Sequence, residues 1–214
     1  MSKSPGKNPV STPLGVIGGS GAYDLLTNGA LGENIDTITL ETPFGKSAPI
    51  HHFRAGNLEY LFLSRHGEKD YSITAPFVNY RANIYALKEC CVERIISWSG
   101  PGIINPSFKP GEYVLPNDII DETKNRETTF FKNRGLGFIR QDRPFCPQIQ
   151  HVIHGSMRSL GFFHHEQAVY VCTEGPRLET PAEIKKFRLH GGDLVGMTLV
   201  PELFLARELE ICYA

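Results

Sequence analysis

The sequence AVYVCTEGPRLETPAEIKKFRLHGGDLVGMTLVPE occupies residues Ala168–Glu202 and carries the pattern of one complete α/β unit. An apolar run at Ala168–Cys172 ends in a polar turn that contains glycine and proline. Thr180 and Glu183 then form the T-x-x-E pattern of a helix capping box, with proline at the first helical position. A second apolar run, Leu194–Met197, follows the helix. We therefore predict strand, turn, helix and strand, which is the repeating unit of α/β folds.

The composition is typical of a soluble globular protein. Of 214 residues, 41% are hydrophobic and 21% are charged, which predicts a single domain over residues 14–214. Residues 1–13 are polar and lack the apolar segment of a signal peptide, so we expect them to form a disordered tail. The net charge of −1 argues against a surface for nucleic acid or anionic membranes. Five cysteines without a C-x-x-C pair are expected to be reduced thiols, which favours a cytoplasmic protein.

Polar or glycine residues follow four predicted strands at the point where each strand ends. They are Ser20 in the run Gly18–Gly21, Arg65 with His66, Ser99 with Gly100, and Thr198. The carboxyl ends of parallel strands meet at one edge of an α/β sheet, so we expect these groups to converge. Hydroxyls, glycine amides and an arginine together complement a phosphate group. The alternatives are a tight turn at the glycines and a solvated pair at Arg65 and His66.

Other segments are predicted from their periodicity. Apolar residues predict a helix from Pro76 to Glu89, capped by Thr74, and another helix from Pro147 to Leu160. The polar segment Asp121–Asp142 has little periodicity and is expected to be a long surface loop. A His-x-x-His pair, His151 and His154, lacks an evident third ligand, so we expect no metal site.

Six sequence blocks resemble a known family. They are Gly18–Gly21, Thr42–Lys46, Arg65–Gly67, Asn79–Asn83, Glu174–Arg177 and Val195–Glu202, in this order. The chain is similar to the S-methyl-5'-thioadenosine phosphorylase branch of the trimeric purine nucleoside phosphorylase family. This resemblance implies a three-layer α/β/α single domain around a mixed, partly barrel-like sheet. It also implies a homotrimer or a dimer of trimers.

The resemblance further implies an enzyme, a pentosyltransferase that cleaves a purine nucleoside with inorganic phosphate. The reaction needs no metal or organic cofactor, because phosphate is a co-substrate. Residues that would hold the phosphate are Ser20, Arg65, His66, Ser99, Gly100 and Thr198. Met197 and Leu178 would contact the nucleoside, and Glu179 stands at a position linked to substrate choice. Partners other than nucleoside and phosphate, such as nucleic acid or a membrane, are not expected.

Several positions depart from the family pattern. The acidic or amide residue that contacts the purine in the family is expected beyond Ala214, so no catalytic residue is assigned. The family's C-terminal helix is likewise expected after that point. Asp70 stands where a histidine near the 5' group is common, and the run Leu178–Thr180 is closer to a methylthioinosine phosphorylase. The resemblance therefore favours 5'-methylthioadenosine as substrate, with a 6-oxopurine nucleoside or methylthioinosine as the alternative. A non-catalytic nucleoside- or phosphate-binding protein is the alternative of another class.

Overall fold

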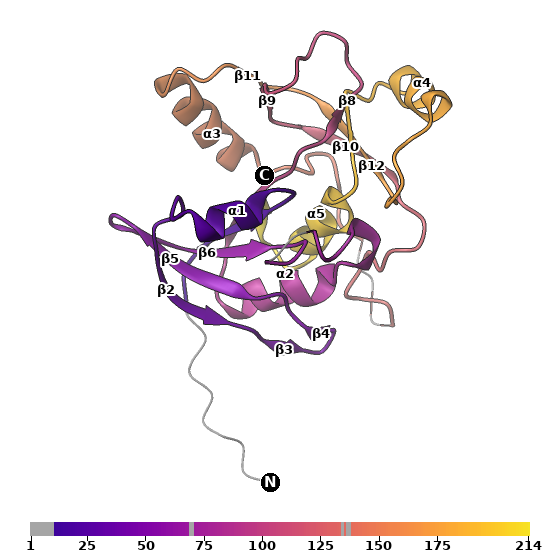
Figure 1. Ribbon diagram of the computed structural model, residues 1–214. Coiled ribbons are helices and arrows are strands. Elements are labelled where there is room, and N and C mark those ends of the chain that lie inside the picture. Colours follow the sequence, from indigo (N-terminus) through magenta and orange to yellow (C-terminus); the bar gives the residue numbers. More distant parts are fainter. Residues whose placement is uncertain (1–10, 69–70, 134, 136–137) are drawn as a thin grey trace.

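The computed structural model describes residues 11–68, 71–133, 135 and 138–214, and it confirms the predicted α/β class (Figure 1). Ordered packing begins earlier than expected, because Thr12 is buried and its hydroxyl donates to the Glu59 carbonyl at 3.1 Å. The Pro13 carbonyl also accepts hydrogen bonds from the backbone N–H groups of Glu93 and Arg94. Thr12 and Pro13 are therefore bonded to the domain, and residues 1–10 of the expected tail lie outside the described residues. Asp70 also lies outside them.

The larger sheet has six strands and brings three strand ends together. Its order is β14 (Cys212–Tyr213), β7 (Arg94–Trp98), β1 (Leu14–Gly18), β6 (Leu58–Ser64), β5 (Ile50–Ala55) and β2 (Glu33–Ile38). The first four strands are parallel, and β5 and β2 are antiparallel to their neighbours. Gly18 at the end of β1 lies opposite Ser64 of β6 and Trp98 of β7. The residues that follow these strands therefore emerge at the same edge.

A second sheet carries the strands of the opening stretch. Its order is β10 (Asp118–Glu122), β12 (Val169–Thr173), β13 (Leu194–Gly196) and β8 (Gly102–Ile103), and only β8 is antiparallel. Two small sheets pair β11 (His164–His165) with β9 (Tyr113–Val114) and β3 (Glu41–Thr42) with β4 (Gly45–Lys46). The mixed β-structure that we expected is thus divided between two larger sheets.

The six-stranded sheet is covered on both faces. Tyr60 and Phe62 of β6 pack with Ala22 of α1 (Ala22–Thr27), whereas Leu61 and Leu63 belong to the core shared with α2 (Tyr80–Glu89) and α5 (Leu199–Glu208). Side chains alternate between the two faces of a strand, so an apolar run such as Leu58–Ser64 suits a strand buried on both sides. Figure 1 shows α1 and α2 on opposite sides of this sheet, which is the layered arrangement that the resemblance implies.

The helix predicted from Pro76 to Glu89 is divided in two. A 3₁₀ turn, η1, covers Ala75–Phe77, and α2 begins only at Tyr80. Asn79 is the N-cap of α2, because its side-chain oxygen accepts from the Ala82 N–H at 3.2 Å. The expected cap, Thr74, makes no side-chain hydrogen bond. The prediction of one helix was therefore wrong at its start, since an internal asparagine offers a better cap.

The remaining helices agree more closely with the sequence. They are α3 (Pro147–Ser159) and α4 (Pro181–Leu189). The predicted capping box of α4 is present, with Thr180 and Glu183 bonded reciprocally. Within the described residues, no helix combines the length and apolar character needed to cross a membrane.

Candidate active site

Three of the predicted strand ends are in direct contact. A Cβ atom on Gly19 would lie 2.7 Å from the Trp98 carbonyl oxygen, and also 3.0 Å from Arg65 Nη1 and 3.1 Å from Ser99 Cα, so only glycine allows the backbone this close. Ser20, which follows, is exposed, and Gly100 is exposed beside half-buried Ser99. The structure thus brings together the ends of β1, β6 and β7, as we expected from their parallel order.

Arg65 is fully buried, and its paired donors already have a partner. Its Nε and Nη2 donate to the two carboxylate oxygens of Glu202 at 2.9 and 2.7 Å. Its Nη1 donates to the Trp98 carbonyl at 3.2 Å. Burial by itself lowers the pKa of Arg65, but Glu202 raises it above its ordinary value, so the guanidinium stays charged. The bidentate contact of Arg65, which was expected to help hold phosphate, is therefore made to Glu202, and Nη1 is the donor nearest Gly19.

Glu202 is the centre of a buried hydrogen-bond network. Besides Arg65, its Oε1 accepts from the Ser97 hydroxyl at 3.0 Å and from the Tyr213 hydroxyl at 2.6 Å. Tyr213 lies in β14, at the edge of the six-stranded sheet. The network therefore fixes the position of Arg65 relative to α5 and β14. Sequence reasoning missed Glu202 because its partner lies 137 positions away.

Thr198 contributes a buried hydroxyl that has no hydrogen-bond partner among the described residues. The Tyr170 hydroxyl lies nearby. Burial raises the pKa of Tyr170 well above its ordinary value, and side-chain hydrogen bonding to Ser99 and Thr198 lowers it in part, although the contact with Thr198 does not meet hydrogen-bond geometry. Tyr170 also fills the space beside Gly196, where a Cβ atom would lie 1.8 Å from the tyrosine oxygen. Because a buried polar group without a partner is costly, Thr198 indicates a place for a polar ligand.

His66 is buried beside Arg65 and is held by its own loop. Its Nδ1 donates to the Ile73 carbonyl at 2.8 Å, so Nε2 is left to accept from the Tyr71 hydroxyl at 3.3 Å. The two rings stack with centroids 4.2 Å apart. Burial lowers the pKa of His66 below 6.5, which favours the neutral ring. His66 is therefore a neutral polar group at the site.

The residues expected to contact the nucleoside or to influence its choice differ in how far they are buried. Met197 is half-buried, and its sulfur would lie 2.6 Å from a Cβ atom on Gly175. Glu179 is also half-buried and accepts a hydrogen bond of 2.6 Å from the Thr173 hydroxyl. Leu178 differs from both, because 80% of it is exposed. In this structure Leu178 therefore has little contact with the rest of the site.

Arg126 is a central residue that sequence reasoning missed. It lies in the segment expected to be a surface loop, yet its side chain is almost completely buried. It donates to the carbonyls of Met197 at 2.5 Å and Glu174 at 2.6 Å, and also to those of Thr173 and Val200. The carbonyls of Thr173, Glu174 and Met197 lie at the ends of β12 and β13, and that of Val200 lies in the first turn of α5. One cation from the loop thus holds the segments that carry Thr198 and the predicted nucleoside residues.

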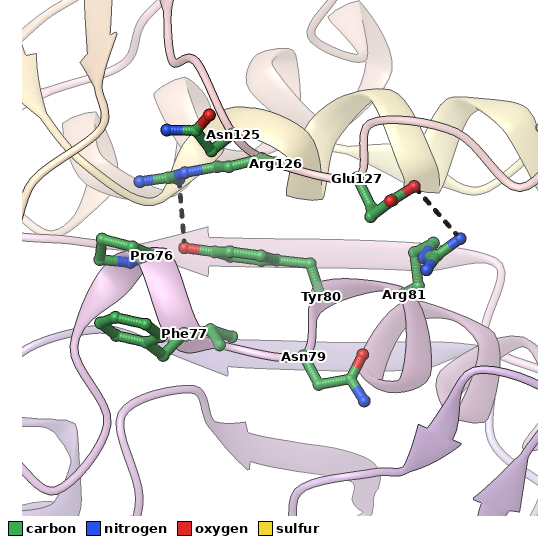
Figure 2. A pocket seen from close by; sticks show the side chains of 9 residues that line it. Pro76, Phe77, Asn79, Tyr80, Arg81, Asn125, Arg126 and Glu127 are labelled. Atoms are coloured by element: carbon green, nitrogen blue, oxygen red, sulfur yellow. Dashed lines mark hydrogen bonds and ion pairs between the residues drawn. The ribbon is translucent and has the colours of Figure 1, made fainter.

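Arg126 also lines a pocket of about 280 Å³ (Figure 2). Its lining residues are Pro76, Phe77, Val78, Asn79, Tyr80, Arg81, Asn125, Arg126 and Glu127. Figure 2 shows Arg126 above the ring of Tyr80, whose hydroxyl it contacts at 3.4 Å. None of the predicted phosphate- or nucleoside-binding residues lines this pocket. The candidate site is therefore the convergence of strand ends and not this pocket.

The fold and the gathered strand ends define an α/β protein with a buried, donor-rich edge that suits an oxyanion. The family model of the Phosphorylase superfamily matches residues 13–214. The chain therefore belongs to the Phosphorylase superfamily.

Individual relatives differ in the activity that their names give. The chain is 44% identical over 208 residues to the 6-oxopurine nucleoside phosphorylase of Pyrococcus furiosus, covering 94% of this chain and 76% of the relative. It is 42% identical over 205 residues to the S-methyl-5'-thioadenosine phosphorylase of Thermofilum pendens, covering 94% and 75%. Among solved structures, it is similar to the methylthioadenosine phosphorylase of Schistosoma mansoni, with a TM-score of 0.88 and 29% identity, covering 94% and 77%. The names of these relatives differ in the purine substrate.

Proposed function

We propose that this protein is a purine nucleoside phosphorylase that acts on 5'-methylthioadenosine. Phosphate oxygen would form a bond to C1' of the ribose while the bond from C1' to the purine nitrogen breaks. The products would be adenine and 5-methylthioribose-1-phosphate, and the proton of the hydrogen phosphate ion would pass to the leaving base. The observation that carries the proposal is the buried Thr198 hydroxyl, which has no hydrogen-bond partner among the residues that the structure describes and lies beside Tyr170.

In this proposal the phosphate is held mainly by hydrogen-bond donors. Glu202 offsets the charge of Arg65, so the ion pair presents little net charge to the anion. The groups that remain to bind phosphate are Arg65 Nη1, the hydroxyls of Ser20, Ser99 and Thr198, the Gly100 backbone and the neutral His66. A dianion fixed next to C1' would stabilise the positive charge that develops on the ribose as the base leaves. We propose that phosphate is the co-substrate and that no metal or organic cofactor takes part.

We propose that the nucleoside binds next to the phosphate, beside Met197, Leu178 and Glu179. Met197 would contact the ribose, because it directly precedes Thr198 on the chain. Leu178 would contact the base, and its exposure leaves it free to do so. Glu179 would influence the choice of base, since its carboxylate is half-buried at the end of β12.

A 6-oxopurine nucleoside or methylthioinosine is the second candidate substrate. The run Leu178–Thr180 favours it, and so do the names of relatives at similar identity. These include the 6-oxopurine nucleoside phosphorylase above and a probable S-methyl-5'-thioinosine phosphorylase of Thermodesulfovibrio yellowstonii, which is 43% identical over 209 residues, covering 97% of this chain and 76% of that protein.

One assay tests the reaction and the substrate together. The protein is incubated with 5'-methylthioadenosine, inosine or methylthioinosine, with and without phosphate, and base release is followed by chromatography. We expect phosphate-dependent release of adenine from 5'-methylthioadenosine at the highest kcat/KM. If hypoxanthine is released from inosine or methylthioinosine faster than adenine is released from 5'-methylthioadenosine, the second candidate is the substrate. No release from any nucleoside, with phosphate or purine still bound in titration, would instead support a non-catalytic binding protein.

Assembly and location are separate proposals. We propose a homotrimer or a dimer of trimers in the cytoplasm, on the basis of the resemblance of the six sequence blocks. Light scattering coupled to size-exclusion chromatography measures the mass of the assembly. A mass equal to one chain would contradict the trimer.

A further inference from the structure

Two histidines and a glutamate, His154, His164 and Glu166, form a cluster that shares no residue with the candidate active site. His154 lies on α3, His164 lies in β11, and Glu166 follows β11; α3 and β11 lie on the same side of the molecule (Figure 1). Potential ligand atoms of the three residues all lie within 4.8 Å of one another. His154 Nδ1 and His164 Nε2 are 2.9 Å apart, and Glu166 Oε1 is 3.9 Å from the same His164 nitrogen.

The hydrogen bonds around His164 set its tautomer. Its Nδ1 lies 3.2 Å from the Phe162 carbonyl, which can only accept, so Nδ1 carries the hydrogen. The lone pair of Nε2 therefore points into the cluster. A metal-binding histidine commonly donates its other N–H to a backbone carbonyl in this way, which fixes the direction of the ring. Only 4% of the His164 side chain is exposed.

The partner histidine is also suited to binding in the neutral form. Because His164 Nε2 accepts, His154 Nδ1 must hold the hydrogen of their mutual bond. If a cation took that place, the hydrogen would move to His154 Nε2, and Nδ1 would become a ligand without loss of a proton overall.

We propose that His154, His164 and Glu166 bind a divalent transition-metal ion of the Zn²⁺ type, with water as the fourth ligand. Imidazole and carboxylate ligands suit Zn²⁺, which takes four ligands in a tetrahedron. Bonds of ~2.0–2.1 Å place two zinc-bound nitrogens about 3.3 Å apart, so the two rings need to separate only slightly. The ion would connect α3 to the small β11–β9 sheet.

Arg158 is the cation that competes for this position. Its Nη2 forms an ion pair with the same Glu166 oxygen that would bind the metal. Arg158 is exposed and follows His154 by one helical turn, so its side chain can move into solvent. Removing Arg158 should therefore strengthen metal binding, whereas removing a residue that merely stabilises the local structure should not.

Calorimetric titration of untagged, chelator-treated protein with Zn²⁺ tests the proposal. A Cys91→Ser background removes the exposed thiol as a competing ligand. We expect one ion per chain, a loss of affinity of at least about 10-fold in His164→Asn, and a smaller loss in Glu166→Gln. Arg158→Ala should raise the affinity several-fold. The matched control His151→Asn, an exposed histidine one turn earlier on α3, should leave it unchanged.

Three outcomes would overturn the site. The first is no Zn²⁺ binding by the parent chain, and the second is a His164→Asn variant that binds Zn²⁺ as tightly as the parent chain. The third is a loss of affinity in the His151→Asn control as large as the loss in His164→Asn. If His164→Asn fails to fold, Arg158→Ala and Glu166→Gln decide the question, because both changes are at exposed positions. In that case, unchanged affinity in both variants would contradict the proposal.

Discussion

At the scale of single residues, the candidate site depends on which buried polar groups already have partners. The Glu202 carboxylate has four donors, from Arg65 twice and from Ser97 and Tyr213. The Thr198 hydroxyl has no such donor or acceptor within the described part of the chain. A fully paired network makes a rigid support, and an unpaired hydroxyl at its edge leaves room for a ligand. Glu202 is thus a positioning residue, and Thr198 is a ligand candidate.

This distinction predicts two different stability effects. Glu202→Gln leaves the fully buried Arg65 without its charged partner, and we expect a loss of about 3–5 kcal/mol in the free energy of unfolding. Tyr213→Phe removes one donor but leaves Glu202 paired, and we expect a loss of about 1 kcal/mol. Urea denaturation measures both values. Equal losses in the two variants would argue against a central role for the ion pair.

Tyr170 is predicted to assist phosphate binding through its hydroxyl. Tyr170→Phe keeps the ring beside Gly196 and removes only the oxygen near Ser99 and Thr198. We expect the KM for phosphate to rise about 3–10-fold, with little change in the KM for nucleoside. Tyr60→Phe is the control, because it removes a buried hydroxyl bonded to the Leu31 carbonyl on the α1 side of the sheet. Equal changes in both KM values would assign Tyr170 a general structural role.

The sequence identified hydroxyls at strand ends but not the residues that support them. Ser20, Ser99 and Thr198 could be found because each follows an apolar run within a few positions. Arg126 could not, because it lies in a polar segment that looks solvated and its partners are backbone carbonyls. Every residue has a backbone carbonyl, so the sequence does not show which carbonyls bind a buried arginine. The sequence signal that remained was the Pro201–Glu202 pair in one of the six resembling blocks, which could have directed attention to Glu202.

At the scale of elements, local signals predicted helix starts well where one cap was available. The α4 capping box is confirmed, since Thr180 N–H donates to Glu183 Oε2 at 2.8 Å and Glu183 N–H donates to Thr180 Oγ1 at 3.3 Å. In the segment before α2, Thr74 and Asn79 both had suitable side chains. The structure uses Asn79, whose amide also donates to the Phe44 carbonyl and so gains a tertiary contact. Phe44 lies 35 positions from Asn79, so the sequence around α2 could not predict this contact.

The capping box predicts a modest effect for a local change. Thr180→Ala removes the side-chain acceptor of the Glu183 N–H, and we expect a loss of about 1 kcal/mol in the free energy of unfolding. Thermal or urea denaturation measures it. Thr180→Ser, which keeps the hydroxyl, is the matched control. A loss in Thr180→Ser as large as that in Thr180→Ala would show that the hydroxyl is not the stabilising group.

At the scale of the whole molecule, two buried cations join segments that are far apart in the sequence. Arg65 extends from the end of β6 to Glu202 on α5, and Arg126 extends from the loop after β10 to the ends of β12 and β13. Tyr170 of β12 interacts both with Ser99, which follows β7, and with Thr198, which follows β13, so strand ends of the two sheets meet near Thr198. The parallel order of the first sheet was predictable from its apolar runs, but the position of the second sheet against it depends on these long-range contacts.

Folding stability should depend on pH through His66. Burial lowers its pKa below the ordinary value of 6.5, so the unfolded chain binds a proton at a pH where the folded chain does not. The stabilising contribution of the neutral ring is complete above 6.5 and is lost as the pH falls towards the lowered value. Urea denaturation at about pH 8 and about pH 5 should show this loss, and His66→Asn should reduce it. A loss of the same size in His66→Asn would assign the pH dependence to other groups.

The central claim is that phosphate binds where the strand ends meet, against the unpaired hydroxyl of Thr198. Thr198→Val preserves the shape of the side chain and removes the hydroxyl. Steady-state kinetics with varied phosphate should show a rise of about 10–100-fold in the KM for phosphate, because a hydrogen bond to an anion is lost. Thr12→Val, a buried threonine with a backbone partner before β1, should leave that KM unchanged. An unchanged KM for phosphate in a folded Thr198→Val variant would contradict the claim.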